Sequence, residues 1–387
     1  MDINKLNGLL FTLGNIDHNA DITKFVFNNP EPDVMTNKRS QETYDALLRE
    51  LNIRYWSCAR EKTRDIYSDQ KVFEEILEKW RKYAEDDVVG SLSAANEKID
   101  YSIQMSGHPN LICNHPYFIL VDYLVPCGTE DLSILDDIYF PYFSRKYEHI
   151  QDNLYLKSHG IMTQTPTQRY MAINWLKLDP TKVTSILPSV SNIPEDDFEK
   201  TPEKLILWVG ADFERKGGYE TLEAFNKLLE KDPSYKLVMV GIEREINSKN
   251  VEVIPFLHGD NISKLNELYK KAKLFVMPAH RENTGLVYLE AMAYKTPVIA
   301  TTRGGLAEVI RRTSSGIVVP PGDPKIIYES MYKLIKDDAL YKQYSDNAYS
   351  FVMKNATHDI FAKNVSDAVG KWLNKAPVPD DYIRYDV

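Results

Sequence analysis

Short apolar runs alternate with longer amphipathic stretches through the second half of the chain. The apolar runs, rich in β-branched residues, are 205–209, 237–240, 251–254, 274–277, 297–300 and 316–319. The stretches with helical spacing are 218–231, 262–272, 285–294, 305–312 and 324–336. Apolar runs of this length predict buried strands, and their alternation with helices is typical of βαβ units. We therefore predict a parallel sheet with helices on both faces.

The first half of the chain also predicts an α/β arrangement. Its predicted strands are 8–13, 117–125 and 161–164. Its predicted helices are 38–51, 68–86, 143–157 and 166–177. Gly14 and Asn15 follow the first strand and are expected to form its turn.

Residues 188–204 carry three prolines and many polar side chains, which is the composition of a linker. We therefore predict two Rossmann-like domains, 1–187 and 205–355, joined by this linker. The remaining segment, 356–387, begins with an amphipathic helix over 357–374 and ends in a tail. Two such domains leave a cleft between them, and ligands of parallel sheets bind outside the carboxyl ends of the strands.

Composition narrows the class of protein. The 387 residues carry a net charge of −9, which argues against a partner made of nucleic acid. The three cysteines, Cys58, Cys113 and Cys127, have no zinc-ligand spacing and are expected to be reduced thiols. The start of the chain has no signal-peptide pattern, and no run reaches the length of a membrane span. We expect a cytoplasmic protein, with contact to the inner face of a membrane left open.

The segment 278–293 (PAHRENTGLVYLEAMA) follows a predicted strand and opens a predicted helix. Glu282 and Glu290 stand eight positions apart, with Gly285 at the turn between them. The start of a helix offers free backbone N–H groups and the positive end of the helix dipole, which together bind phosphate. The alternative is an ordinary helix start with one exposed and one half-buried carboxylate.

Two further loops lie at predicted strand-to-helix turns. In 207–218 (LWVGADFERKGG), Gly210 follows the strand, and Arg215 and Lys216 precede two glycines. Arginine and lysine in such a loop suit a phosphate ligand, although a solvated basic turn is the alternative. The spacing of a nucleoside-triphosphate-binding loop is absent. The third loop is 301–308 (TTRGGLAE), and its alternative is a plain Gly-Gly turn that caps a helix.

Together these blocks resemble the retaining GT-B glycosyltransferases of the large Glu-x7-Glu family (group 1, or family four). The resemblance covers about 204–324 and rests on Glu282 and Glu290 together with several blocks in the same order. Those blocks are 291–293 (AMA), 297–301 (PVIAT), Gly304-Gly305, Glu308 and 319–324 (VPPGDP). The family includes many bacterial polysaccharide and lipid glycosyltransferases.

The resemblance implies a GT-B fold, with two parallel sheets facing a central cleft, and a nucleoside-diphosphate sugar (UDP or GDP) as donor. Glu290 would accept hydrogen bonds from the ribose, Glu282 would contact the donor sugar, and Arg215 and Lys216 would neutralise the diphosphate. The other donor-binding positions implied are Gly14, Gly210, Asn283, Thr284, Gly285, Leu286 and Val287. Domain 1–187 would bind the acceptor, which is expected to be a carbohydrate, a lipid-linked glycan or a protein.

The chain departs from the family pattern at several positions. Ala211 stands where many relatives have arginine, so Arg215 would take over that role. Thr284 replaces an aromatic residue, and Tyr294 and Lys295 replace small ones. No histidine aligns with the N-domain histidine of many relatives. Asp122, after a predicted strand, is our candidate for that catalytic position, with a strand-end turn as its alternative. His115 and His159 are weaker candidates.

We therefore expect a metal-independent hexosyltransferase with no cofactor, because no Asp-x-Asp triplet is present to hold a metal with the diphosphate. The last helix is expected to cross back onto the first domain, as in GT-B proteins. A non-catalytic GT-B subunit of a glycosyltransferase complex is the main alternative. A phosphorylase or nucleotide-sugar epimerase is another. The sugar, base, acceptor, linkage and oligomeric state stay open.

Overall fold

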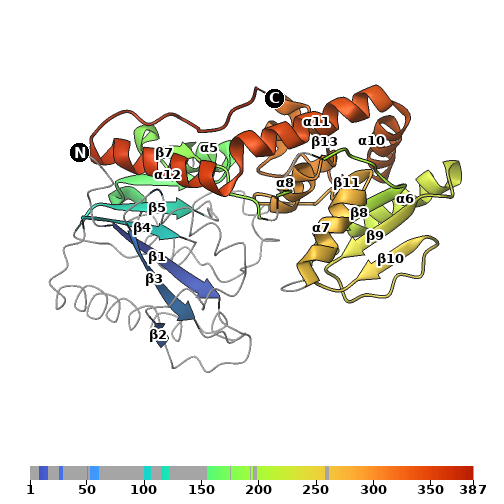
Figure 1. The fold of residues 1–387 in the computed structure, drawn as a ribbon, viewed down its shortest axis with the longest axis horizontal. Helices are drawn as coiled ribbons and strands as arrows, with labels where there is room; N and C mark the ends of the chain where they lie inside the picture. Colours follow the sequence, from blue (N-terminus) through green and yellow to red (C-terminus); the bar gives the residue numbers. More distant parts are fainter. Residues whose placement is uncertain are drawn as a thin grey trace. The chain divides into compact units, whose positions relative to one another are not determined.

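The computed structural model describes residues 8–15, 26–28, 50, 53–60, 100–105, 115–121, 155–174, 176–191, 193–194, 198–257 and 261–386. The chain divides into two compact units. The described part of unit 1 comes from the chain up to Ile186 and from Ala362–Tyr382. Unit 2 contains Leu187–Phe361 and the residues from Ile383 onward. Each unit is described below by itself (Figure 1).

Unit 1 is built on a seven-stranded sheet with the order β2-β3-β1-β4-β5-β6-β7. Its strands are β1 (Gly8–Asn15), β2 (Val26–Asn28), β3 (Ile53–Arg60), β4 (Tyr101–Met105), β5 (Tyr117–Val121), β6 (Gly160–Thr163) and β7 (Val183–Ser185). All pairs in it are parallel except β2 with β3. A helix α5 (Pro166–Asn174) and a 3-10 turn η5 (Pro180–Lys182) connect β6 to β7. Strand β5 is buried along its whole length, as its apolar sequence predicts.

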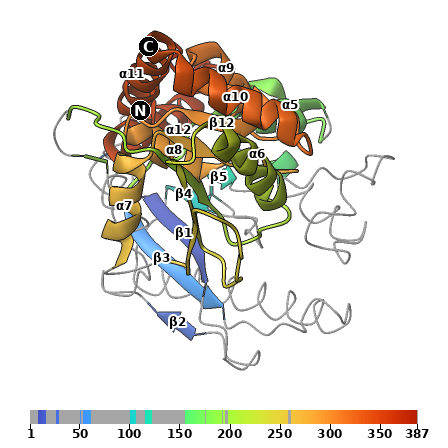
Figure 2. The ribbon, with the colours of Figure 1, turned by 90° about the vertical axis from the view of Figure 1, so that its right-hand side faces the viewer.

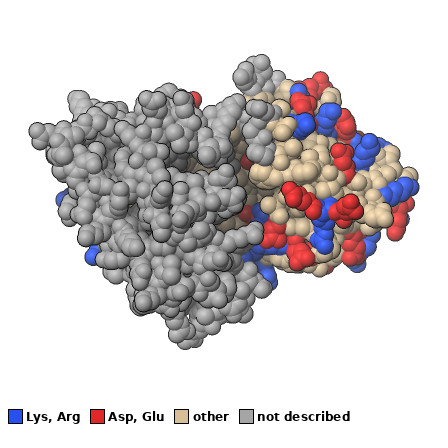
Figure 3. Space-filling view, turned by 90° about the horizontal axis from the view of Figure 1, so that it is seen from below, with Lys and Arg blue, Asp and Glu red and all other residues tan. Residues whose placement is uncertain are grey.

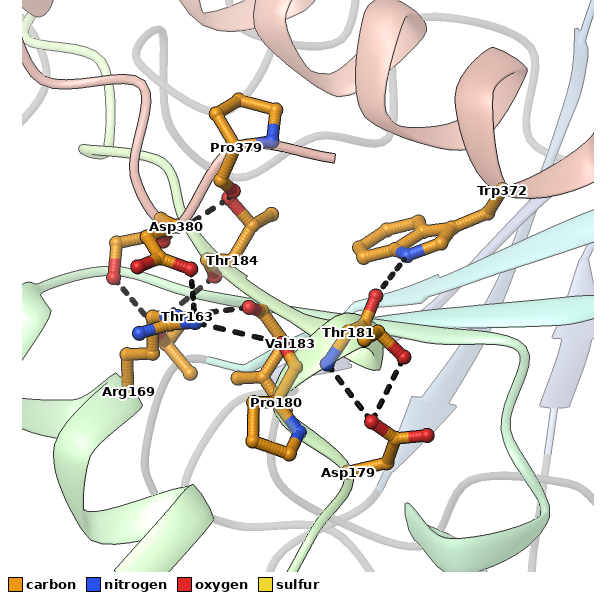
Figure 4. Close-up of polar contacts among 11 residues, drawn as sticks. Thr163, Arg169, Asp179, Pro180, Thr181, Val183, Thr184, Trp372, Pro379 and Asp380 are labelled. Carbon is orange, nitrogen blue, oxygen red and sulfur yellow. Dashed lines mark hydrogen bonds and ion pairs between the residues drawn. The ribbon is translucent and has the colours of Figure 1, made fainter. Parts of the chain in front are cut away.

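The C-terminal segment of the chain completes unit 1. Helix α12 (His358–Leu373) places Trp372 in a stack on Phe118 of β5, with ring centroids 5.6 Å apart. Gly160 lies under the same indole, so a side chain there would collide with it. Beyond the helix, the tail runs beside β7 (Figures 1 and 4). An isolated parallel bridge joins Ser185 to Asp381.

Polar contacts hold the tail on β7, as Figure 4 shows. The Thr184 hydroxyl donates to Pro379 O at 2.7 Å, and the Arg169 guanidinium pairs with Asp380 at 2.5 Å. The indole N–H of Trp372 donates to Thr181 O at 3.0 Å. The tail therefore pairs with strand β7, the last in the order of the sheet.

Unit 2 is built on a six-stranded, wholly parallel sheet with the order β10-β9-β8-β11-β12-β13. Its strands are β8 (Leu205–Val209), β9 (Lys236–Val240), β10 (Val251–Ile254), β11 (Leu274–Val276), β12 (Val298–Thr301) and β13 (Gly316–Val319). Its helices are α6 (Gly218–Lys231), α7 (Ile262–Lys271), α8 (Leu286–Ala293), α9 (Ala307–Thr313), α10 (Pro324–Lys336) and α11 (Asp338–Asn355). Helix α6 packs beside α10 (Figure 2).

This strand order is that of a doubly wound Rossmann sheet, which extends from β8 in one direction and from β11 in the other. The order reverses between β8 and β11, and ligands of such sheets bind at that switch point, outside the carboxyl ends of the strands. The loops that follow β8 and β11 are therefore expected to form a ligand-binding site.

The structure agrees with most predicted elements of unit 2 to within one or two residues. The predicted turn at Gly14-Asn15 is wrong, because β1 continues through both residues and pairs with β3 as far as Arg60. The helices predicted at 68–86, in most of 38–51 and at 143–154 lie outside the described residues. The same holds for 122–125, the end of the strand predicted at 117–125. Segment 188–204, expected as a linker, is counted with unit 2, and Val190 lies in that unit's core.

Candidate functional site

Two loops meet at the switch point of unit 2. The loop after β8 covers 210–217, and the loop after β11 covers 277–285. The backbone N–H of His280 donates to Arg215 O at 2.8 Å, and the guanidinium of Arg215 donates back to Arg281 O at 3.0 Å. These two contacts in opposite directions fix the loops against each other.

Gly217 explains why the loops approach so closely. It is the N-cap of α6 and has a left-handed backbone conformation with φ of 72°. A Cβ at this position would lie 2.5 Å from Pro278 O, which is closer than any side chain tolerates. Glycine is therefore required here for its backbone angle and for its lack of a side chain.

Three residues predicted to act on the donor converge in these loops. The ammonium of Lys216 donates to Glu282 Oε2, and the Arg215 guanidinium lies 3.9 Å from the same oxygen. Arg215 is further held by its Nε, which donates to Asp212 Oδ2 at 3.0 Å. The side chain of Glu282 is only 10% exposed, and the two cations offset the cost of its burial. The structure therefore brings Glu282, Arg215 and Lys216 into one cluster.

The third loop of the sequence analysis joins the same cluster. The backbone N–H of Glu282 donates to Arg303 O at 2.9 Å, and Glu282 forms an isolated parallel bridge with Gly304. The N–H of Gly305 donates to Asn283 O at 3.0 Å. All three strand-to-helix loops, after β8, β11 and β12, thus lie side by side.

Helix α8 starts at this cluster. Its N-cap, Gly285, has a φ of 86° and makes no side-chain cap hydrogen bond, and Thr284 before it is buried. The helix is anchored from below by Tyr288, whose hydroxyl donates to Met277 O at 2.6 Å. Burial raises the pKa of the Tyr288 hydroxyl well above its usual value. Leu286 and Val287, in the first turn, remain partly exposed.

Glu290 lies one turn further along α8. Its carboxylate accepts a hydrogen bond from the hydroxyl of Tyr269 on α7, at 3.0 Å. The Tyr269 ring stacks on Tyr294, with centroids 6.0 Å apart, so the unusual aromatic residue at 294 packs behind this pair. Sequence reasoning missed Tyr269, because nothing in the spacing of α7 indicates a partner on α8.

A second missed contact links His280 to Glu220. His280 Nε2 lies 2.7 Å from Glu220 Oε1, and since a carboxylate can only accept, the imidazole nitrogen donates. Glu220 sits in the first turn of α6. His280 belongs to the first motif of the sequence analysis, but its partner is 60 positions away in the chain.

The remaining candidate site residues belong to unit 1. Gly14 lies near the carboxyl end of β1, the edge where a ligand binds. Asp122 lies outside the described residues. His115 and His159 precede β5 and β6, so they stand at the amino ends of parallel strands and away from that edge. Burial lowers the pKa of both imidazoles, and His115 Nε2 lies 3.0 Å from the Ser102 hydroxyl.

The described residues show neither a metal-binding cluster nor a helix that could span a membrane. No group of three or more His, Cys, Asp or Glu in that part of the chain is placed to hold a metal ion. Among the helices described there, none has both the length and the hydropathy needed to span a membrane.

Two Rossmann-like units define the GT-B class of fold, and solved glycosyltransferases share it. A glycosyltransferase from Rickettsia africae superimposes with a TM-score of 0.62 at 13% identity, over 96% of this chain and 100% of that chain. WaaG, involved in lipopolysaccharide biosynthesis, gives 0.58 at 17% identity, over 93% and 98%. The sucrose-phosphate synthase of Thermosynechococcus elongatus gives 0.62 at 14%, over 96% and 100%. The predicted fold class is confirmed.

Residues 190–351 match the family model described as Glycosyl transferases group 1, which confirms the resemblance to group 1 glycosyltransferases over this region. An uncharacterized glycosyltransferase of Methanocaldococcus jannaschii, MJ1607, is 32% identical over 181 residues, 44% of this chain and 43% of that protein. The capsular polysaccharide biosynthesis glycosyltransferase CapM of Staphylococcus aureus is 28% identical over 182 residues, 44% and 47%. The matched stretch thus spans less than half of each relative.

Proposed function

We propose that the protein is a retaining glycosyltransferase that moves a sugar from a nucleoside-diphosphate sugar to a hydroxyl acceptor. The observation that carries the proposal is the convergence of Arg215 and Lys216 on Glu282, beside the start of α8 and at the switch point of a Rossmann sheet. Two cations and a helix N-terminus suit a diphosphate. The group 1 family match supports the class of reaction.

Each residue of the cluster has a distinct chemical task in this proposal. Negative charge grows on the diphosphate as the glycosidic bond breaks, and Arg215 and Lys216 stabilise that charge. Glu282 holds a hydroxyl of the donor sugar, and the amides at 284–287 hold phosphate oxygens. Glu290 accepts from the ribose hydroxyls, and Tyr269 orients its carboxylate.

Positioning supplies the rest of the rate. Alignment of the acceptor hydroxyl with the anomeric carbon is worth up to about 7–11 kcal/mol in favourable cases. A phosphate oxygen of the donor takes the acceptor proton in the mechanism considered for this family. No protein nucleophile is then needed, in contrast to retaining glycosidases with two close carboxylates. We propose further that no metal takes part, because lysine and arginine are present to neutralise the diphosphate.

The acceptor belongs to polysaccharide, glycolipid or glycoprotein synthesis. The relative CapM is a glycosyltransferase of capsular polysaccharide biosynthesis, which supports a polysaccharide acceptor, and SQD2 of Arabidopsis thaliana is a sulfoquinovosyl transferase. We place the protein in the cytoplasm, including the inner face of the membrane. On the visible face of unit 2, basic and acidic side chains are interspersed, without the one-sided basic patch that nucleic acid requires (Figure 3).

One observation favours a second candidate function, that of a non-catalytic partner subunit. Ala211 leaves the position directly after Gly210 without a guanidinium, which many relatives have there. Arg215 lies in the same loop and reaches to within 3.9 Å of Glu282, so the cluster keeps two cations. An enzyme and a binding subunit therefore differ in turnover, not in the ability to hold a nucleotide.

The test combines binding with turnover. The protein is screened by thermal shift against UDP- and GDP-sugars, and a ligand at 100 times its Kd stabilises by about 2.7 kcal/mol. Donor hydrolysis is then followed with and without EDTA. Binding with hydrolysis that survives EDTA is the expected result. Binding without hydrolysis under any condition favours the partner subunit. No binding of any nucleotide sugar rejects the proposal, and loss of activity with EDTA that manganese restores rejects metal independence.

A further inference from the structure

The contact between His280 and Glu220 has no task in the mechanism above, yet it lies next to the cluster that does. His280 is two residues before Glu282, and its backbone N–H donates to the carbonyl of Arg215. Its imidazole reaches across to Glu220 Oε1, 2.7 Å away, on the first turn of α6. The pair therefore joins the loop after β11 to the helix that follows the loop after β8.

The surroundings of Glu220 suggest that stability is not the reason for the pair. The side chain is only 15% exposed, and Oε2 has no hydrogen-bond partner among the residues that the structure describes. A buried carboxylate oxygen without a partner costs free energy, which the N-terminus of α6 offsets only in part. A buried group that is left unsatisfied in this way calls for another explanation.

The geometry points to a positioning role, and the inference rests on the proposed function. We propose that the Glu220–His280 pair fixes the loop 278–282 against α6 and so sets the distance between Glu282 and the two cations. Neither Glu220 nor His280 touches the donor in this proposal. They act through Arg215, whose carbonyl accepts from His280 N–H, and through Glu282, which follows His280 in the chain.

The loops are packed so closely that the loss of the Glu220–His280 pair is expected to disturb the cluster. Gly217 leaves no room for a Cβ against Pro278, and Arg215 makes hydrogen bonds to both loops. When the side-chain pair is lost, the loop 278–282 keeps its backbone hydrogen bonds to Arg215 and Arg303 and the contacts that the Arg215 and Lys216 side chains make with it, but it loses its side-chain link to α6. A misplacement of about 1 Å at reacting groups can cost on the order of a hundredfold in rate.

The test uses the variants E220A, H280A and the double variant, with E220Q as the conservative rescue. Glutamine keeps an oxygen that accepts from His280 at the same chain length. E223A is the matched control, because Glu223 lies on the same helix and loses only an exposed ion pair to Lys227. For each protein we measure kcat and KM for donor hydrolysis, the affinity for UDP and GDP by calorimetry, and Tm.

The expected result is a fall in kcat of about tenfold or more for E220A and H280A, with nucleotide affinity within about threefold of the parent. The double variant falls no further than the worse single variant, since both residues act through one contact. E220Q retains about half of the parent kcat or more, because the hydrogen bond survives. The E223A variant matches the parent.

A readout that does not need turnover accompanies the kinetics. The indole N–H of Trp208 donates to Lys216 O at 3.1 Å, so this ring reports the position of the loop 210–217. The chain has five tryptophans, and 5-fluorotryptophan labelling gives a ¹⁹F resonance for each, with Trp208 assigned from W208F. We expect the Trp208 resonance to shift in E220A and H280A and to stay in place in E223A.

Several results overturn the proposal. One is a kcat for E220A and H280A within about twofold of the parent. Others are a loss of nucleotide affinity as large as the loss of kcat, additive effects in the double variant, or an unmoved Trp208 resonance. Failure of the proposed function is seen separately, in a parent protein that neither binds nor hydrolyses any nucleotide sugar. In that case the ¹⁹F shift alone still decides whether the pair affects the loop 210–217, which His280 contacts through the Arg215 carbonyl.

Discussion

The ion pair between Lys216 and Glu282 is largely buried, so its free-energy contribution differs from that of an exposed ion pair. Exposed ion pairs contribute about 0–1 kcal/mol to stability. The side chains of Lys216 and Glu282 are 14% and 10% exposed, so each charge has given up much of its hydration. A lysine kept at this cost beside a helix N-terminus is more useful for binding an anion than for holding the fold together.

Removal of either cation therefore affects turnover more than donor binding. Charge on the diphosphate is greatest in the transition state, so Arg215→Ala and Lys216→Ala are each expected to lower kcat by about a hundredfold, with a smaller effect on donor affinity. The double variant is less than additive, because both cations act on one anion. Kinetics on the preferred donor and nucleotide calorimetry check this.

The control for these two variants is Lys227→Ala, which removes an exposed cation of α6 that pairs with Glu223. It is expected to keep the parent kcat. Near-normal turnover in folded Arg215→Ala and Lys216→Ala would show that these cations form a solvated turn, and that the leaving group is stabilised elsewhere.

For single residues, the sequence predicted that Glu282, Arg215 and Lys216 lie together, but it did not predict the helix residues that contact the neighbouring site positions. Glu282, Arg215 and Lys216 follow strands of one parallel sheet, whose carboxyl ends meet at one edge, so their proximity follows from topology. Tyr269 beside Glu290 and Glu220 beside His280 depend on how helices pack against each other. The chain pattern does not contain that information. Asp122 stays a prediction.

Most strands of unit 2 were predictable because they are apolar on both faces. Strand β8 reads LILWV and is buried throughout. Strands β3 (IRYWSCAR) and β4 (YSIQM) in unit 1 were missed, because polar residues interrupt their apolar runs. In β4, Ser102 and Gln104 are buried, and Ser102 Oγ lies 3.0 Å from His115 Nε2, so tertiary contacts satisfy what the pattern counted as polar.

A lysine from outside helix α7, Lys200, contacts the C-terminal end of that helix. The amine of Lys200 lies 2.8 Å from Tyr269 O, 2.6 Å from Lys270 O and 2.7 Å from the Thr296 hydroxyl. It therefore donates hydrogen bonds to the last carbonyls of the helix. Burial, together with the smaller effect of the Lys273 charge nearby, lowers the pKa of Lys200 to about 6.

The lowered pKa of Lys200 makes the free energy of unfolding depend on pH. Between about pH 6 and 10, the unfolded chain holds a proton on Lys200 that the folded protein has lost, so stability rises with pH. The largest slope is about 1.4 kcal/mol per pH unit. We expect urea unfolding to show this rise in the parent and not in Lys200→Met. Equal slopes for both proteins from pH 7 to 9 would contradict it.

Over the whole molecule, the last residues of the chain contact each unit in turn. The tail up to Tyr382 pairs with β7 of unit 1. From Ile383 the tail belongs to unit 2, where Ile383 is buried in the core and Asn355 exchanges two hydrogen bonds with the Arg384 backbone, at 2.6 and 2.9 Å. The sequence predicted that the final helix crosses back, but the tail has no periodic pattern that would predict its contacts.

Deletion of 379–387 is expected to destabilise the protein, and mainly through unit 2. Burial of Ile383 is worth about 1.5–3 kcal/mol, and the buried Asn355 left without Arg384 costs about 1–3 kcal/mol. On unit 1 the loss is smaller, because Asp380 is 81% exposed and Arg169 keeps its hydrogen bond to Val183 O at 2.9 Å. The variant Asp380→Ala alone is thus expected to cost less than about 1 kcal/mol.

Hydrogen exchange read by mass spectrometry measures the two effects separately. Peptides around Asn355 and the Val190 amide, which donates to Ala356 O at 2.8 Å, report unit 2, and peptides over β7 report unit 1. In the truncated chain we expect faster exchange at both, with the larger change in unit 2, and in Asp380→Ala a small change confined to β7. If the truncation leaves Tm and the unit 2 peptides unchanged, the buried Ile383 and the Asn355 hydrogen bonds do not hold that unit together. The tail would then be only a covering for the edge of β7.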